Sequence, residues 1–125
     1  MSEIDLVTLV RAYLKAFDER DLTACMAYFT EDAGIEFQDG RFVGADGVRE
    51  WHEERFLADL RLIVVEDIRL EADDKVVVDA VVTSDTLRVW RMDNLAGTVT
   101  FLFQGDKIRT ASFGLRMYNE GLWHV

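Results

Sequence analysis

The sequence has no proline, one cysteine and two histidines among its 125 residues. Without proline-rich linkers, internal repeats or low-complexity segments, nothing marks a domain boundary, so we expect residues 1–125 to form a single domain. The only cysteine, Cys25, has no partner for an internal disulfide. The N-terminus also lacks the basic and apolar regions of a secretory signal, and together these features predict a cytoplasmic protein.

Positive charge and long apolar runs are also scarce. Fourteen Lys and Arg against 24 Asp and Glu give a net charge of −10. This charge repels phosphate backbones and anionic lipid surfaces, so we expect no nucleic-acid partner and no membrane association. Apolar runs such as Val76–Val78 and Ala80–Val82 are far shorter than the roughly 20 residues of a membrane-spanning helix.

Clusters that would hold a metal or a cofactor are missing. His52 and His124 stand far apart in the sequence, which contains no His-Glu-x-x-His motif and no group of cysteines. A glycine-rich phosphate loop is absent as well. We therefore predict neither a metal site nor a cofactor.

Half of the residues are apolar, and in the first half of the chain they follow helical spacing. Leu6, Val10, Tyr13 and Phe17 recur at intervals of four, three and four, which predicts a helix from Ser2 to about Asp18. Asp5 with Ser2 resembles a capping pair at its start, and Asp21 is a natural N-cap for a second helix from Leu22 to about Phe29. A third helix is expected from about Ala45 to Ala58, with one stripe formed by Val48, Trp51, His52, Arg55 and Phe56.

Strand signals follow, and they alternate with turn residues. The predicted strands are 35–38, 41–43, 60–71, 75–91, 97–104 and 107–118, with turns at 39–40, 73–74 and 105–106 and a connection at 93–94. Helices followed by an antiparallel meander indicate the α+β class. Alternation places Val76, Val78, Ala80, Val82, Val99, Phe101, Phe103, Ala111 and Phe113 on the face that meets the helices, and Asp79 and Asp85 on the other.

Three segments carry a family resemblance: Tyr-Leu-Lys-Ala-Phe-Asp-Glu-Arg-Asp-Leu at 13–22, Tyr-Phe-Thr-Glu-Asp-Ala at 28–33 and Gly-Asp-Lys-Ile at 105–108. With the Gly-bounded helix and four long strands, they resemble the nuclear transport factor 2-like superfamily, in its SnoaL-like branch related to ketosteroid isomerase and limonene epoxide hydrolase. The resemblance implies a cystatin-like cone, in which a curved mixed or antiparallel sheet wraps against three helices from the N-terminal half. It also implies a deep apolar pocket and a homodimer formed through the outer sheet face.

The resemblance also suggests site residues. Tyr13 matches a tyrosine that ketosteroid isomerases use as an oxyanion donor, and His52 matches a tyrosine that hydrogen-bonds to it. However, Phe37 stands where those isomerases keep their aspartate base, Val99 stands near their second aspartate, and Phe113 stands near an acid of the epoxide hydrolase. The scaffold of the family is therefore expected here without its best-known chemistry.

The residues themselves leave several alternatives open. Tyr13 and His52 are either a catalytic pair that polarises a ligand oxygen or core residues that tie the first helix to the third. Arg55 either forms an ion pair with Glu36 or Asp39 or binds a ligand carboxylate. The acids nearest to a catalytic position, which are Asp39, Asp79 and Asp85, are more typical of a turn or of the outer face, and Glu53 and Glu54 of a solvated helix face.

We predict that the pocket binds a small hydrophobic molecule. Its lining is expected to comprise Phe17, Phe29, Ile35, Phe37, Trp51, Arg55, Phe56, Val78, Val99, Phe101, Ala111 and Phe113. Such a protein would bind, or also transform by isomerase, cyclase or hydrolase chemistry, an apolar compound that is carbonyl-bearing or cyclic. The alternative is a non-catalytic dimeric interaction or structural domain with a filled pocket, and the sequence does not decide between an enzyme and a binding protein.

Overall fold

A computed structural model describes residues 5–37, 40–85, 89, 91 and 94–115. In chain order the elements are α1 (Leu6–Asp18), α2 (Leu22–Ala27), β1 (Phe29–Phe37), β2 (Gly40–Val43), α3 (Gly44–Leu57), β3 (Arg61–Ala72), β4 (Lys75–Thr83), β5 (Leu95–Gln104) and β6 (Lys107–Leu115). The fold is therefore of the α+β class, as the sequence predicts.

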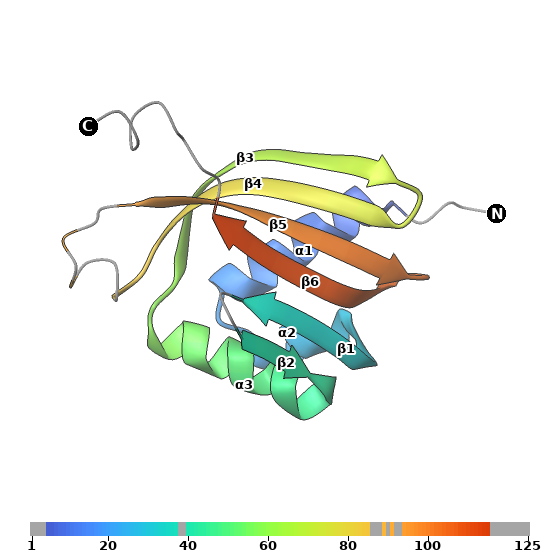
Figure 1. Ribbon diagram of the computed structural model, residues 1–125, viewed down its shortest axis with the longest axis horizontal. Coiled ribbons are helices and arrows are strands. Elements are labelled where there is room, and N and C mark those ends of the chain that lie inside the picture. Colours follow the sequence, from blue (N-terminus) through green and yellow to red (C-terminus); the bar gives the residue numbers. More distant parts are fainter. Residues whose placement is uncertain (1–4, 38–39, 86–88, 90, 92–93, 116–125) are drawn as a thin grey trace.

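The strands form one mixed sheet in the order β2-β1-β6-β5-β4-β3. Each neighbouring pair is antiparallel except β1 and β6, which run parallel. Figure 1 shows α1 and α2 behind this curved sheet and α3 running along the edge that β2 and β1 form. The three helices thus enclose one face of the sheet, and the core lies between the two layers.

Helices α1 and α2 begin at aspartate caps, whereas Val43 precedes α3 and makes no side-chain capping hydrogen bond. The Asp5 carboxylate accepts hydrogen bonds from the Thr8 backbone N–H at 3.2 Å and from its hydroxyl at 2.7 Å. Asp5 is therefore the N-cap of α1, which agrees with its place in the predicted capping pair, but the helix begins at Leu6, later than predicted. Ser2, the other member of that pair, lies outside the described residues. Asp21 caps α2 as predicted, through the N–H of Ala24 at 3.1 Å.

Two strand boundaries differ from the prediction. Helix α2 ends at Ala27, so Phe29 begins β1 instead of ending the helix. The polar residues 30–32 hide this longer strand, because its pairing with β6 is irregular between Phe29 and Gly34. Strand β4 ends at Thr83 and does not extend to Arg91, since the Asp85 N–H donates to the Ala58 carbonyl at 2.8 Å and draws the chain toward the end of α3. The predicted positions 90, 93 and 116–118 lie outside the described residues.

The predicted inner face of the meander is confirmed by burial and register. Val76, Val78 and Ala80 are buried, and they lie opposite Phe101, Val99 and Gly97 of β5. Two details escape simple alternation. A bulge between Leu102 and Phe103 brings Ile108 into the core, while Val82 is only half-buried.

Candidate functional site

Tyr13 of α1 and His52 of α3 meet at the centre of the core. The Tyr13 hydroxyl lies 2.7 Å from Nε2 of His52, and Nδ1 of His52 lies 2.7 Å from the carbonyl oxygen of Val48. Because a carbonyl only accepts, Nδ1 carries the ring proton, and Nε2 accepts from the Tyr13 O–H. The i, i+4 spacing of Val48 and His52 along α3 is the sequence signal for this second bond, and it fixes the tautomer.

This pair is neutral and enclosed. His52 is 0% exposed and Tyr13 is 2% exposed. Burial lowers the pKa of His52 from 6.5 to about 4 and raises the pKa of Tyr13 well above 10. Phe17, Tyr28, Phe29 and Phe101 surround the Tyr13 ring in edge contacts with centroids 5.5–6.3 Å away. The one proton of the Tyr13 hydroxyl is therefore used inside the protein, in a contact that ties α1 to α3.

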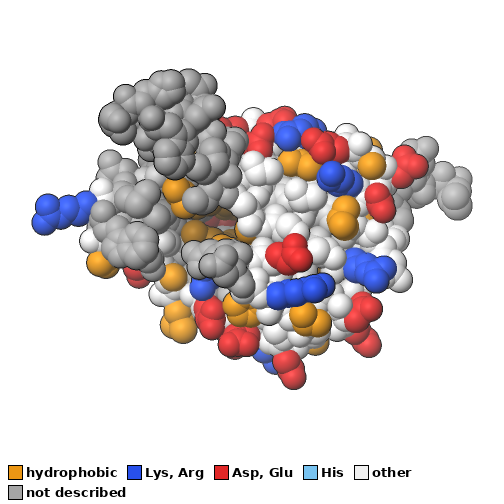
Figure 2. Space-filling model, in the orientation of Figure 1, with side chains coloured by type: hydrophobic (Ala, Val, Ile, Leu, Met, Phe, Trp, Pro, Cys, Tyr) orange, Lys and Arg blue, Asp and Glu red, His pale blue; other side chains and the backbone are white. Residues whose placement is uncertain are grey.

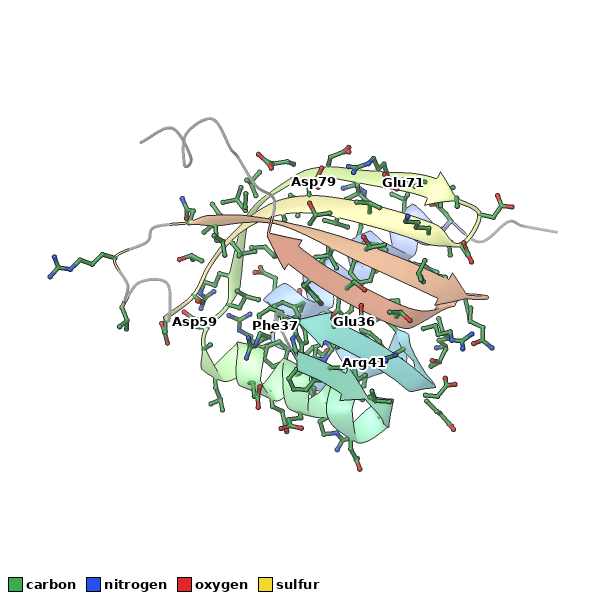
Figure 3. The ribbon with its side chains drawn as sticks, viewed as in Figure 1. Glu36, Phe37, Arg41, Asp59, Glu71 and Asp79 are labelled. Carbon is green, nitrogen blue, oxygen red and sulfur yellow. The ribbon has the colours of Figure 1, made fainter. Side chains whose placement is uncertain are left out.

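A second group of side chains, which we call the aromatic mouth, consists of Phe37, Trp51, Arg55 and Phe113. The Trp51 ring lies 4.7 Å from Phe113 and 5.8 Å from Phe37, measured between centroids. The Arg55 guanidinium carbon lies 4.5 Å from the Phe37 centroid, a cation–π distance. Figure 3 shows Phe37 at the end of β1, next to α3. Strands β1 and β6 and helix α3 thus bring these residues together.

Two buried donors of the aromatic mouth lack an acceptor. Among the described residues, neither Nε1 of Trp51 nor Nε of Arg55 has a hydrogen-bond partner. In the described part of the chain, Arg55 contacts one carboxylate, that of Glu54, which lies 3.4 Å from Nη2. Burial lowers the pKa of Arg55 below its usual range. Unpaired buried donors are rare in folded proteins and costly, so this is the position in the fold with the clearest need for an added acceptor.

The predicted ion pair between Arg55 and Glu36 is wrong. Glu36 lies on the outer face of the sheet, where its carboxylate accepts from the Ser112 hydroxyl at 2.9 Å. Asp39, the other predicted partner, lies outside the described residues. Sequence spacing places Arg55 on the inward stripe of α3, but it cannot show which face of β1 its neighbours occupy.

The predicted lining residues fall into two sets. The first is packed into the core and comprises Phe17, Phe29, Ile35, Val78, Phe101 and Ala111, while the second is half-buried and comprises Phe37, Phe56, Val99 and Phe113. The two remaining lining residues are Trp51, which is buried at 1% exposed, and Arg55, which is half-buried. Figure 2 shows apolar side chains at the floor of a hollow near the ends of β1 and β6. The described part of the cone is thus filled at its base and more open toward the aromatic mouth.

Comparison with known proteins places the chain in a family. Residues 10–111 match the model of the SnoaL-like domain. The chain belongs to the SnoaL-like family. This membership confirms the resemblance to the nuclear transport factor 2-like superfamily that the sequence motifs indicate. No curated protein matches the sequence.

Solved structures share this SnoaL-like fold at low identity. The epoxide hydrolase/cyclase-like enzyme SalBIII, studied for pyran ring formation in the polyether salinomycin, has a TM-score of 0.76 at 20% identity, covering 88% of this chain and 89% of that one. A proposed polyketide cyclase from Sinorhizobium meliloti has a TM-score of 0.75 at 19% identity, covering 86% and 94%. A cystatin-fold protein from Novosphingobium aromaticivorans has a TM-score of 0.74 at 17% identity, covering 90% and 99%. At these identities the likeness shows the fold alone.

Among the described residues, the acids that the sequence suggests do not form a catalytic group in this SnoaL-like domain, and Asp39 lies outside those residues. Asp79 lies on the outer face, where its carboxylate accepts from Arg69 at 2.9 Å and from Thr98 at 2.8 Å. Asp85 is exposed beyond the end of β4. Glu53 and Glu54 are exposed on α3 as predicted, and Glu53 lines a surface depression of about 440 Å³ with Phe56 and Leu57.

Other features add no chemistry. Burial raises the pKa of the Cys25 thiol to about 12, so this side chain is an unreactive part of the core. Within the part of the chain that the structure describes, no three His, Cys, Asp or Glu side chains gather as a metal site. None of its described helices is long and apolar enough to span a membrane.

Proposed function

We propose that this SnoaL-like domain binds a small, largely apolar molecule at the aromatic mouth, with an oxygen of the ligand accepting a hydrogen bond from Trp51. The observation that carries this proposal is the unpaired Nε1 of Trp51 in a side chain that is 1% exposed. An indole N–H can only donate, and leaving it unpaired in a buried position costs about 1–3 kcal/mol. A ligand oxygen would recover this cost.

The surroundings of Trp51 support an apolar and ring-shaped ligand. Phe37 and Phe113, whose ring centroids lie 5.8 Å apart, offer half-buried aromatic surface next to the indole ring. Binding sites for small molecules are typically apolar concavities with a few polar groups that orient the ligand. SalBIII, an epoxide hydrolase/cyclase-like enzyme with a role in pyran ring formation, shares the fold. Cyclic, oxygen-bearing compounds are therefore the class that we propose.

Chemical transformation of the ligand is a further part of this proposal. Tyr13 and His52 are its candidate residues, and they would polarise a substrate oxygen. The Tyr13 hydroxyl already donates its only proton to Nε2 of His52, at 2.7 Å. For catalysis, Tyr13 would have to break this hydrogen bond and donate to the substrate oxygen instead. Isomerase, cyclase or hydrolase chemistry would also require a base, which would be water or a residue other than Asp79.

Thermal-shift screening with matched ligands tests the binding proposal. We expect cyclic ketones and lactones to raise the melting temperature of the wild-type protein in a concentration-dependent way. Trp51→Phe keeps an aromatic ring at this position but removes the N–H together with the five-membered ring of the indole, so it should weaken this stabilisation. Glu53→Gln changes an exposed residue of the same helix and should leave it unchanged. If no compound in a broad cyclic library stabilises the wild-type protein, the binding proposal is wrong.

The filled base of the cone favours a second candidate, a non-catalytic dimeric domain. Ile35, Phe101 and Ala111 are fully buried, so this part of the predicted pocket has no room for a ligand. In this proposal the outer sheet face forms a homodimer, and the protein acts in the cytoplasm, as its composition predicts. Sedimentation equilibrium tests the dimer directly, and a monomer throughout the micromolar range would contradict it.

A further inference from the structure

The partly buried arginines of this protein differ in how their charges are compensated. Arg20 donates to the Asp59 carboxylate at 2.9 Å and to the Phe17 carbonyl at 3.3 Å. On the outer face, Arg69 reaches three carboxylates at 2.9–3.0 Å. Arg55 has a single contact of 3.4 Å with Glu54, longer than the 2.7–2.9 Å usual for charged hydrogen bonds. Among the described residues, the charge of Arg55 is therefore compensated far less than the charges of Arg20 and Arg69.

The weak compensation of the Arg55 charge is costly because the side chain is largely buried. The Arg55 side chain is only 20% exposed, and its Nε is buried with no partner among the described residues. Its guanidinium carbon lies 4.5 Å from the Phe37 ring and 6.0 Å from the Trp51 ring. Aromatic faces attract a cation, but they accept no strong hydrogen bond from its N–H groups. A planar acceptor with negative charge would satisfy both needs.

Trp51 supplies the second and independent observation. It precedes Arg55 by four residues on α3, so the two side chains lie on the same helix face. Its buried Nε1 is a neutral donor without an acceptor. One cation and one neutral N–H suit a carboxylate, whose two oxygens accept from both. A phosphate would need more donors than this pair provides.

We propose that Arg55 and Trp51 form a subsite for the carboxylate of a flat, apolar ligand whose rings pack on Phe37 and Phe113. This inference rests on the proposed function and names the ligand group that it recognises. The net charge of −10 repels anions in general. Affinity for a carboxylate would therefore depend on these local donors, and the bound anion would lie within a protein that otherwise disfavours it.

Calorimetric titration with 2-naphthoate and with 2-naphthamide tests the subsite, since the two probes share one ring system and differ in charge. We expect the wild-type protein to bind naphthoate at least about tenfold more tightly than the amide, as a hydrogen bond to a charged group is worth about that factor or more. Arg55→Gln should abolish this preference and Arg55→Lys should retain part of it. Arg49→Gln removes the same charge from an exposed position of α3 and should change nothing.

Trp51→Phe should weaken naphthoate binding by about tenfold, because one hydrogen bond to the carboxylate is lost. Equal affinities of the wild-type protein for both probes would overturn the carboxylate subsite while leaving the proposed binding function intact. A preference for naphthoate that survives Arg55→Gln would overturn the assignment to Arg55. If neither probe binds at millimolar concentration, the carboxylate subsite fails, and the thermal-shift screen of the cyclic library decides separately whether the proposed binding function fails as well. Comparing the affinities of the wild-type protein for naphthoate and naphthamide tests the carboxylate subsite even if Trp51→Phe does not fold.

Discussion

Arg20 and Asp59 form an ion pair between the residues that terminate α1 and α3. Nη2 of Arg20 lies 2.9 Å from Oδ1 of Asp59, and both residues have positive φ angles, of 60° and 53°. Each occupies the left-handed position just after its helix, where glycine is usual. The ends of the two helices are thus joined through residues that hold an unfavourable backbone conformation.

Below this ion pair the two helix ends also share an aromatic contact. The rings of Phe17 and Phe56 lie 5.2 Å apart, and the Arg20 guanidinium lies 5.9 Å and 5.4 Å from their centroids. The Leu60 N–H donates to the carbonyl of Arg55 at 3.0 Å, which closes the last turn of α3. The contacts that join the C-terminal ends of α1 and α3 therefore also hold the backbone of Arg55 in place at the aromatic mouth.

Two substitutions of Arg20 separate the cost of its positive φ angle from the loss of its ion pair with Asp59. Both Arg20→Ala and Arg20→Gly lose the ion pair and the ring contacts, but only glycine adopts the left-handed conformation without strain. We expect the glycine variant to be more stable than the alanine variant by about 1 kcal/mol in urea unfolding. Arg11→Ala, at an exposed position within α1, serves as a control and should have little effect. Equal stability of the two Arg20 variants would mean that the positive φ costs nothing.

Gly47 offers a test of packing against helix propensity. A Cβ atom there would lie 2.9 Å from the backbone carbon of Phe42, closer than atoms can approach. Alanine normally stabilises a helix by about 1 kcal/mol relative to glycine. Because overpacking costs about 1–3 kcal/mol, we expect Gly47→Ala to lower the free energy of unfolding. Gly114→Ala, which meets open space, is the control. A Gly47→Ala protein as stable as the wild type would show that β2 can move away from α3.

The sequence predicts much of this fold, because helical spacing and strand alternation record which side chains are buried. The inward stripe of α3 and most of the inner face of β4 to β6 follow from those periods, whereas the burial of Ile108 depends on a bulge that alternation does not predict. The parallel pairing of β1 with β6 is not predictable in this way, since alternation within a strand does not specify its neighbour. For the site, spacing brings Tyr13 and His52 to facing helices. The unpaired donors of Trp51 and Arg55 depend on distances between elements, which only the structure provides.

A double-mutant cycle measures how strongly Tyr13 and His52 are coupled. Tyr13→Phe leaves Nε2 of His52 buried without a donor, and His52→Phe leaves the Tyr13 hydroxyl without an acceptor. Each single change should lower the free energy of unfolding by about 1–3 kcal/mol. The double variant should lose less than the sum of the two, because it leaves neither group unpaired. Urea unfolding of the four proteins gives the coupling energy, and strictly additive losses would contradict the hydrogen bond.

The stability of the protein should fall as the pH drops from 6.5 toward 4. Burial lowers the pKa of His52 from 6.5 to about 4, so in this range the unfolded chain binds a proton that the folded protein does not. The contribution of His52 is therefore complete above pH 6.5, declines below it and reaches a loss of about 3 kcal/mol near pH 4.

The Tyr13→Phe/His52→Phe double variant is the matched control for this pH dependence. It also removes the Tyr13 hydroxyl, but the pKa of that group is raised well above 10, so His52 is the one group removed that titrates in this pH range. Urea unfolding of both proteins at several pH values isolates the contribution of His52 to the free energy of unfolding. The carboxylates that both proteins share cancel when the two free energies are subtracted. We expect the wild-type protein to lose stability relative to the double variant as the pH falls through this window. A difference that stays constant from pH 7.5 to pH 4.5 would show that His52 can take up a proton in the folded state without cost. The enclosed geometry of the pair, with both ring nitrogens already hydrogen-bonded, opposes that outcome.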